Sequence, residues 1–320
     1  MNTSTNTPEN DTIPYRHIAR RSGELYLETA EILTKSLNID LVTGIVFLTI
    51  SRLNLVQFLR DQDLARKYAG LDQLPPDSSR EPISVYSVAR QIALPYETVR
   101  RHANKLVKLG LCSRVDGGGL IISRTFLESE LAASMSERTL EIITAFVRNV
   151  GAVGLSFPST GPRPTDVRHH VGRLNMKHFL TITEHLSKGM NLDLLAGLVL
   201  MAVITANTRQ IRENQKLSLE FGMMDNVPPD SLRQPVSVYA IAKTLRLPYE
   251  TTRRYIASLT EAGFCKRVPG GGIVAPSEAQ LLPGFPAMME SNKLVVLSLL
   301  QDLAAVGISG ASWPRPAAVF

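Results

Sequence analysis

Arginine, glutamate and asparagine side chains gather on one side of the segment 95–109. Drawn as a helix with about 100° between successive residues, the segment places Glu97, Arg101 and Asn104 on one face. Arginine can pair with both acceptors of a guanine edge, glutamate can accept from cytosine, and asparagine can pair with adenine. This face could therefore form hydrogen bonds to base edges. The opposite face is apolar and is expected to meet a core: Val99, Ala103 and Leu106.

The same face occurs twice in the chain. The stretch that begins at Pro82 recurs without a gap at Pro235, 153 positions later, and about half of the positions up to 119 are identical. The second copy keeps Glu250, Arg253 and Arg254 in register. A charged helix face is usually only a solvated face. Its retention in both copies favours a binding role over that interpretation.

The similarity between the two copies extends over residues 17–156 and 170–309 of the 320-residue chain. It predicts two domains, each long enough to bury its own core, and the Pro-rich stretch between them is typical of a linker. The expected boundaries are a disordered tail over 1–14, a first domain over 15–157, a linker over 158–169, a second domain over 170–310 and a C-terminal tail over 311–320.

Each copy is predicted to be mainly helical, with one short pair of strands. In the first copy an amphipathic helix over 16–36 precedes a more apolar helix from Asp40 to about 60. Ser84 is suited to begin a helix, which stops before Pro95; the next helix ends at Gly110. Strand, Gly-rich turn and strand follow, and a last helix spans about 137–150.

Helix, tight turn, helix, glycine and hairpin follow one another as in a winged helix-turn-helix. The segment LPYETVRRHANKLVKLGL and the following SRVDGGG resemble the recognition helix and wing of bacterial winged-helix regulators, including the MarR-like and GntR-like groups. This resemblance implies tandem duplicated winged helix-turn-helix domains with long flanking helices. It also implies a transcriptional regulator that binds double-stranded DNA with both copies, as a pseudo-dimer within one chain.

Basic charge is concentrated in these two segments, as phosphate binding requires. Residues 83–124 carry seven lysines and arginines against two acidic residues, and residues 236–277 carry six against two, whereas the whole chain has a net charge of only +6. The residues expected to contact DNA are Ser84, Tyr86, Tyr96, Glu97, Thr98, Arg100, Arg101, Asn104, Lys105 and Arg114 in the first copy, and Ser237, Tyr239, Tyr249, Glu250, Thr251, Arg253, Arg254 and Arg267 in the second.

Some of these residues have a second interpretation. Ser84 and Ser237 could cap helices, and Tyr86 and Tyr239 could be half-buried packing residues, rather than reach phosphates. Tyr96 and Tyr249 are interpreted as packing residues first and DNA contacts second, and Arg114 and Arg267 as strand residues that reach a flanking backbone or minor groove.

The two copies are not identical. His102, Asn104, Lys105 and Lys108 of the first correspond to Tyr255, Ala257, Ser258 and Glu261 of the second. We therefore expect two related but unequal half-sites, with the first copy binding phosphate more strongly.

Other residue types give no catalytic or metal-binding pattern. Cys112 and Cys265 are expected to be small buried residues, and four histidines (169, 170, 178 and 185) lack ligand spacing. The GGG runs are followed by no phosphate-loop motif. No enzyme, catalytic residue, metal or cofactor is therefore expected.

The polar N-terminus lacks the apolar core of a signal peptide. The most apolar run, 194–206, is shorter than the roughly 18 to 20 residues that span a bilayer, and it is expected to be a core or dimer-interface helix. No membrane contact and a cytoplasmic, nucleoid-associated location are therefore expected.

Two other functions remain open: a tandem winged-helix scaffold for proteins, of the chromosome-partition type, and a plasmid-type replication initiator. A scaffold has no need for the ETxRR face in both copies, and an initiator usually lets its two modules diverge.

The resemblance further implies a small-molecule effector, provided that a pocket lies between the long helices and the motif. A homodimer through the apolar helices is a further expected partner.

Overall fold

The computed structural model describes residues 13–152, 157 and 166–309, and it is mainly helical with two small antiparallel sheets. The elements of the first half are α1 (Tyr15–Ser36), α2 (Leu41–Asn54), α3 (Val56–Arg60), α4 (Gln62–Lys67), η2 (Asp77–Ser79), α5 (Val85–Ile92), α6 (Tyr96–Lys108), β1 (Cys112–Arg114), β2 (Leu120–Ile122), α7 (Arg124–Leu127) and α8 (Glu130–Gly151). Those of the second half are α9 (Arg168–Gly189), α10 (Leu194–Asn207), α11 (Arg209–Glu213), α12 (Gln215–Glu220), η3 (Asp230–Leu232), α13 (Val238–Leu245), α14 (Tyr249–Glu261), β3 (Lys266–Arg267), β4 (Ile273–Val274), η4 (Ser277–Leu281) and α15 (Phe285–Ala305).

Side-chain caps explain where several helices begin. Asp40 accepts a hydrogen bond from the Thr43 amide at the start of α2, and Asp193 does the same for α10. The helix predicted from Asp40 to about residue 60 is wrong in one respect, because it breaks at Leu55 into α2 and α3. The helix predicted from about residue 137 begins earlier, at Glu130, because Ser129 caps it.

The ends of the expected linker and tail belong to folded elements. Helix α9 begins at Arg168, so His169 and His170 lie in its first turn and not in a linker. Ile13 is 5% exposed and belongs to a core cluster, although it was assigned to a disordered tail. Residues 1–12, 158–165 and 311–320, which make up most of the two tails and of the linker, lie outside the described residues.

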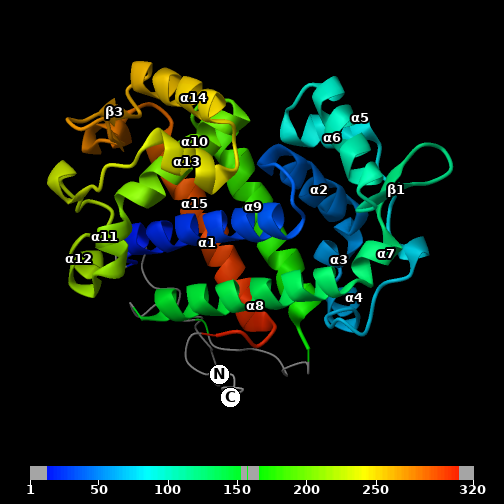
Figure 1. The fold of residues 1–320 in the computed structure, drawn as a ribbon. Coiled ribbons are helices and arrows are strands. Elements are labelled where there is room, and N and C mark those ends of the chain that lie inside the picture. The colour runs from blue at the N-terminus through cyan, green and yellow to red at the C-terminus, as the bar shows by residue number, and fades with distance from the viewer. Residues whose placement is uncertain (1–12, 153–156, 158–165, 310–320) are drawn as a thin grey trace, which may run out of the picture.

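Four long helices form the middle of the molecule (Figure 1). Helix α1 lies along α8, α9 lies along α15, and each pair also contacts the other, through α8 with α9 and α1 with α15. Helices α5 and α6 with β1 lie at the upper right of Figure 1, and α13 and α14 with β3 lie at the upper left. The apolar run 194–206 is part of α10, which lies in the core as expected.

Two equivalent arginines connect the halves. Arg20 on α1 donates to the carbonyls of Ser218 and Phe221 at the end of α12, both at 3.0 Å. Its counterpart Arg173 on α9 donates to Ala65 and Tyr68 at the end of α4, at 2.8 and 2.9 Å. Carbonyls at a helix C-terminus lack internal partners and carry partial negative charge, so each guanidinium satisfies and caps a helix of the other half.

The same symmetry places equivalent residues face to face. Tyr26 and Phe179, which are 153 positions apart, stack with ring centroids at 4.3 Å and an interplanar angle of 11°. Contacts of residues with their own counterparts are typical of an isologous interface between two subunits. The duplicated chain thus forms within itself the kind of interface that a symmetric dimer forms between two chains.

The hydrophobic core is shared between the halves. One cluster, around Val88 and Leu106, contains residues of the first half alone. The other two combine both halves: one joins Tyr26 and Ile45 to residues of α9 and α10, and the other joins α1 and α8 to α9 and α15. The expectation of a separate core in each half is therefore wrong for two of the three clusters.

Within the described ranges, no single helix is both long and apolar enough to cross a membrane. Helices α1 and α2 pass that test only as a pair, which is bent by 98° at its junction.

The cross-half arginines are expected to control the stability of the whole chain. Arg173→Ala should lower the free energy of unfolding by about 2–4 kcal/mol, because it removes two buried hydrogen bonds from a charged donor. Urea unfolding followed by circular dichroism would measure this. Unfolding should remain a single transition because the halves share their core; two separate transitions would contradict the shared core. Arg60→Ala, an exposed change on α3, is the control and should alter stability by less than about 0.5 kcal/mol.

Candidate nucleic-acid interface

Each half carries one compact unit of two helices and a hairpin. We call Ser84–Ile122 unit 1 and Ser237–Val274 unit 2. Ser84 and Ser237 cap the first helix of their units by accepting from the amides of Ser87 and Ala240, so their capping role is confirmed. The turn between the two helices has a left-handed residue in both units, Ala93 at φ 53° and Arg246 at φ 50°.

The second helix of each unit packs as its sequence predicts. Val99, Ala103 and Leu106 are fully buried, as are Thr252 and Ile256 at the matching face of α14. The helix α6 ends at Lys108, and Gly110 follows with φ 72°, as expected of a helix C-terminus. The burial of this face leaves the opposite, charged face in solvent.

The hairpin of unit 1 pairs Cys112 with Ile122 and Arg114 with Leu120, and its turn holds Gly117 and Gly118 at φ 86° and 84°. Such angles favour glycine, which explains the first two glycines of this GGG run. The third, Gly119, has no room for a side chain, because a Cβ there would lie 2.7 Å from the Cβ of Pro82. Both hairpins are short, and Ile83 adds one further bridge to Leu120. The predicted strand, turn and strand are confirmed.

The structure places every predicted contact residue at least partly in solvent. Thr98 and Thr251 are partly covered, and the other sixteen are exposed. Tyr86 and Tyr239 are 66% and 67% exposed, so their interpretation as half-buried packing residues is wrong. Tyr96 and Tyr249 are 50% and 49% exposed, which leaves half of each ring available beside the charged face.

Ion pairs organise the charged face in both units. Glu97 pairs with Arg100 at 2.6 Å, and Glu250 pairs with Arg253 at 2.8 Å. The Arg100 side chain lowers the pKa of Glu97. Exposed pairs of this kind contribute little to stability, so a polyanion can exchange for the carboxylate. Arg101 and Arg254 occupy equivalent exposed positions and make no side-chain hydrogen bond or ion pair within the described residues.

Three predicted contact residues of unit 1 already have partners within the protein. The Lys105 ammonium lies 2.7 Å from Asp40 Oδ2, and the Arg114 guanidinium donates to Asn104 Oδ1 at 2.7 Å. His102 also lies near the start of α2, with its Nδ1 2.7 Å from Thr43 Oγ1. Lys105 and His102 therefore connect α6 to the start of α2.

Asp40 forms an ion pair with Lys105, a role that the sequence did not reveal. Burial opposes its ionisation, but hydrogen bonds from Lys105 and Thr43 outweigh that effect and lower its pKa to about 2. The residue was recognised as a helix start, yet its pairing with Lys105 depends on how α6 packs on α2. No local pattern could have indicated that contact.

An asparagine holds each hairpin on the helical frame, by which we mean α1, α2, α8, α9, α10 and α15. The Asn54 amide donates to the carbonyls of Glu81 and Leu120 and accepts from the Ile122 amide. Asn207 makes the equivalent three bonds in the second half. The asparagines thus fix the hairpins relative to α2 and α10, and neither was singled out in the sequence.

Arg246 connects unit 2 to the other half. Its guanidinium donates to the Thr34 carbonyl at 2.6 Å and to Asn38 Oδ1 at 3.3 Å. The equivalent residue of unit 1 is Ala93, which cannot form such bonds. The two units are therefore anchored to the frame differently.

The cysteines are buried as expected. Cys112 and Cys265 are each 2% exposed, and burial raises the pKa of both thiols to about 12. Both are thus protonated at neutral pH and are unreactive. No group of three or more metal-ligating side chains occurs among the described residues.

Two equivalent cavities lie between the long helices and the units. The first, of about 190 Å³, is lined by Phe47, Phe126, Ala132, Arg80, Arg173 and others; the second, of about 90 Å³, is lined by the counterparts of many of these residues. Phe285 and Met289 take the places of Ala132 and Ser136 and fill much of the second cavity.

The first cavity contains hydrogen-bond donors without partners. The Nε atoms of Arg80 and Arg173 are buried and have no hydrogen-bond partner within the described residues. Arg80 pairs with Asp77 through another nitrogen, but Arg173 has no carboxylate partner in the described part of the chain. In the second cavity the Nε of Arg20, the counterpart of Arg173, is likewise buried without a partner among the described residues, but the Nε of Arg233, the counterpart of Arg80, is satisfied by Asp230 at 3.1 Å.

Comparison of the chain with protein-family models, with curated proteins and with solved structures finds no match.

The Asn54 contacts give a test of how the hairpin is held. Asn54→Ala should lower the free energy of unfolding by about 2–4 kcal/mol, since it leaves buried backbone groups without partners. It should also speed hydrogen exchange at the Ile122 amide. Asn54→Asp keeps the acceptor for that amide and should protect it better than alanine does. Equal exchange in both variants would show that the asparagine does not hold the hairpin.

Proposed function

We propose that the protein is a sequence-specific transcriptional regulator that binds double-stranded DNA through two winged helix-turn-helix units. The observation that carries this proposal is the exposed Glu-Arg-Arg face, present on the second helix of both units and supported by one rigid frame. In this assignment α6 and α14 enter successive major grooves, and the hairpins contact the flanking backbone.

The equivalent arginines Arg101 and Arg254 are the principal base readers. Both are exposed and make no side-chain hydrogen bond or ion pair within the described residues, so neither must break an ion pair to reach a base; Arg254 only lies over the Tyr255 ring, at 5.9 Å from its centroid. Arg100 and Arg253 can leave their glutamates for phosphates, which is favourable because counterions are released from DNA. Ser84, Tyr86 and their counterparts Ser237 and Tyr239 lie at the start of each unit, where hydroxyls reach phosphate.

The protein acts as an internal pseudo-dimer in this proposal. Fusion of the two readers raises the effective concentration of the second after the first has bound. Because unit 2 has Ala257 and Ser258 where unit 1 has Asn104 and Lys105, the two half-sites are related and unequal. The interlocked halves fix the distance between the readers, so the spacing of the half-sites should be strict.

The two alternatives are less well supported. A protein-binding scaffold needs no exposed arginine at the same helix position of both units. A replication initiator is disfavoured because the two faces have kept Glu, Thr and both arginines.

Selection from random duplex DNA tests the proposal. The purified chain should enrich a two-part motif, with affinity that falls steeply between about 50 and 200 mM salt. Arg101→Ala and Arg254→Ala should each weaken binding by about 1–3 kcal/mol and relax the sequence preference in one half-site only. Arg60→Ala, outside both units, is the matched control. Failure to enrich any motif, or unchanged binding by the double variant, would refute the proposal.

We further propose that the first cavity binds a small effector with an apolar body and a carboxylate. The unpaired Nε donors of Arg80 and Arg173 attract an anion, and the phenylalanine walls accept an apolar group. Because Arg80 also donates to the Ile122 carbonyl of the hairpin, a ligand here couples unit 1 to the frame.

Naphthoate can serve as the probe for this cavity, measured by its effect on DNA affinity. The double variant Ala132→Phe with Ser136→Met copies the filling residues of the second cavity and leaves both arginines in place. It should bind DNA normally but lose the response to naphthoate. A response that persists in the filled variant would place the effector elsewhere.

A further inference from the structure

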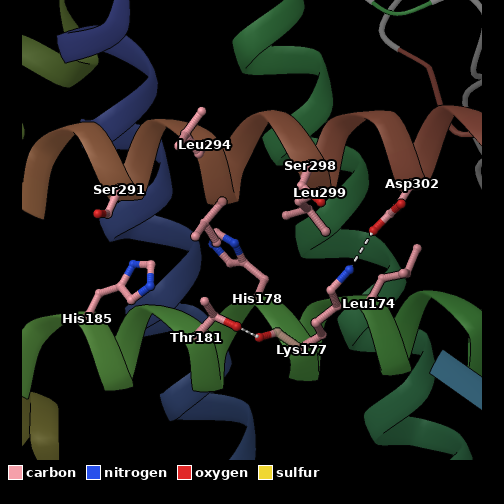
Figure 2. A pocket seen from close by; sticks show the side chains of 11 residues that line it. Leu174, Lys177, His178, Thr181, His185, Ser291, Leu294, Ser298, Leu299 and Asp302 are labelled. Carbon is pink, nitrogen blue, oxygen red and sulfur yellow. Dashed lines mark hydrogen bonds and ion pairs between the residues drawn. The ribbon is translucent and has the colours of Figure 1, made fainter. Parts of the chain in front are cut away.

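A second type of pocket lies in the second half, away from both units, between α9 and α15. It has a volume of about 310 Å³ and opens to the surface (Figure 2). Leu174, Leu294, Val295 and Leu299 form its apolar walls, and an ion pair between Lys177 and Asp302 at 3.1 Å lies at one end. Leu294 is 60% exposed at the rim, so the pocket has an apolar edge that nothing in the described chain covers.

Two histidines of α9 point into this pocket (Figure 2). His178 is 2% exposed, and its Nδ1 is buried with no hydrogen-bond partner within the described residues; its Nε2 lies 3.5 Å from Ser22 Oγ. The Nδ1 of His185 is likewise buried and unpartnered among the described residues. A buried polar nitrogen without a partner is unfavourable, so two in one pocket need an explanation.

The other half shows that folding does not require these histidines. The positions equivalent to His178 and His185 on α1 are Leu25 and Ile32, which are 1% and 4% exposed and pack in the core. An apolar side chain at either position therefore supports the same long helix. At the equivalent place in the first half, Arg21 and Glu24 form an ion pair, and Arg212 of α11 joins it at 3.0 Å.

The charges around the pocket restrict what can bind. Burial lowers the pKa of His178 to about 4, so its ring is neutral at physiological pH. Lys177 and Asp302 neutralise each other. The remaining polar groups are the His185 imidazole and the hydroxyls of Thr181, Ser291 and Ser298. The pocket therefore offers mainly hydrogen bonds and apolar contact, and the described residues that line it include no unpaired carboxylate, lysine or arginine.

We propose that this pocket binds an elongated, uncharged small molecule with an apolar body and hydroxyl groups. His178 and His185 are seven positions apart, which is roughly 10 Å along the helix. A ligand lying along the groove can thus place one hydroxyl against each imidazole, and a hydroxyl can either donate to or accept from the free nitrogen. One such molecule would bind per chain, because the first half lacks both histidines. The site is independent of the proposed DNA contacts.

Isothermal titration of the full chain with 4,4′-dihydroxybiphenyl tests the proposal, because that molecule is neutral and elongated and has a hydroxyl at each end. We expect saturable binding of one molecule per chain. Biphenyl, which lacks the hydroxyls, and biphenyl-4,4′-dicarboxylate, which is charged, should each bind at least tenfold more weakly. No saturable binding, or equal binding of all three probes, would overturn the proposal.

Replacing both histidines with their counterparts in the first half tests whether they bind the ligand. The variant His178→Leu with His185→Ile should fold with an unchanged or higher melting temperature and should bind dihydroxybiphenyl at least tenfold more weakly. His170→Leu, a change of the same kind on the same helix but outside the pocket, should bind as the parent does. In the parent, the imidazole nitrogen resonances of His178 should shift on titration. If the double variant keeps its affinity for dihydroxybiphenyl, the histidines have no role in binding. Because the pocket lies away from both units, every variant should bind DNA as the parent does.

Discussion

Arg20 and Arg173 join the two halves of the molecule through hydrogen bonds from buried charged groups. Each guanidinium is almost entirely removed from water, and burial lowers the pKa of both to about 10. Within the described residues, each donates to two carbonyls at the end of a short helix of the other half. These four hydrogen bonds hold the two halves in one relation.

This relation positions everything that stands on the frame. The stacked Tyr26 and Phe179 fill the centre of the interface, and Asn54 and Asn207 then hold the hairpins to the helices on either side. The charged helix faces are consequently displayed by two halves that share their hydrophobic core. In the proposed regulator, that shared core sets the distance between half-sites, whereas a flexible linker would leave it variable.

Duplication within one chain has let the two halves differ in ways that a homodimer cannot. Arg246 clamps one turn to the opposite half, while Ala93 leaves the equivalent turn without such bonds. The cavity lined by Arg173 has about 190 Å³, whereas its counterpart, lined by Phe285 and Met289, has about 90 Å³. His178 and His185 correspond to Leu25 and Ile32 in the first half. These differences lie at a turn and at the cavities, whereas the arginine and asparagine contacts between the elements are the same in both halves.

The sequence by itself determined the local structure. The repeat, the caps at Asp40 and Ser84, the glycine after α6 and the buried face around Leu106 all follow from short-range patterns, because helix periodicity and capping involve residues a few positions apart. Only the tertiary structure decided how the halves interlock, that Lys105 is held by Asp40, and where the cavities lie. Those features join residues that are far apart in the chain, so no short-range pattern indicates them. From its neighbours in the sequence, Arg173 would be expected to lie at the surface; only the folded structure brings the carbonyls of the other half next to it.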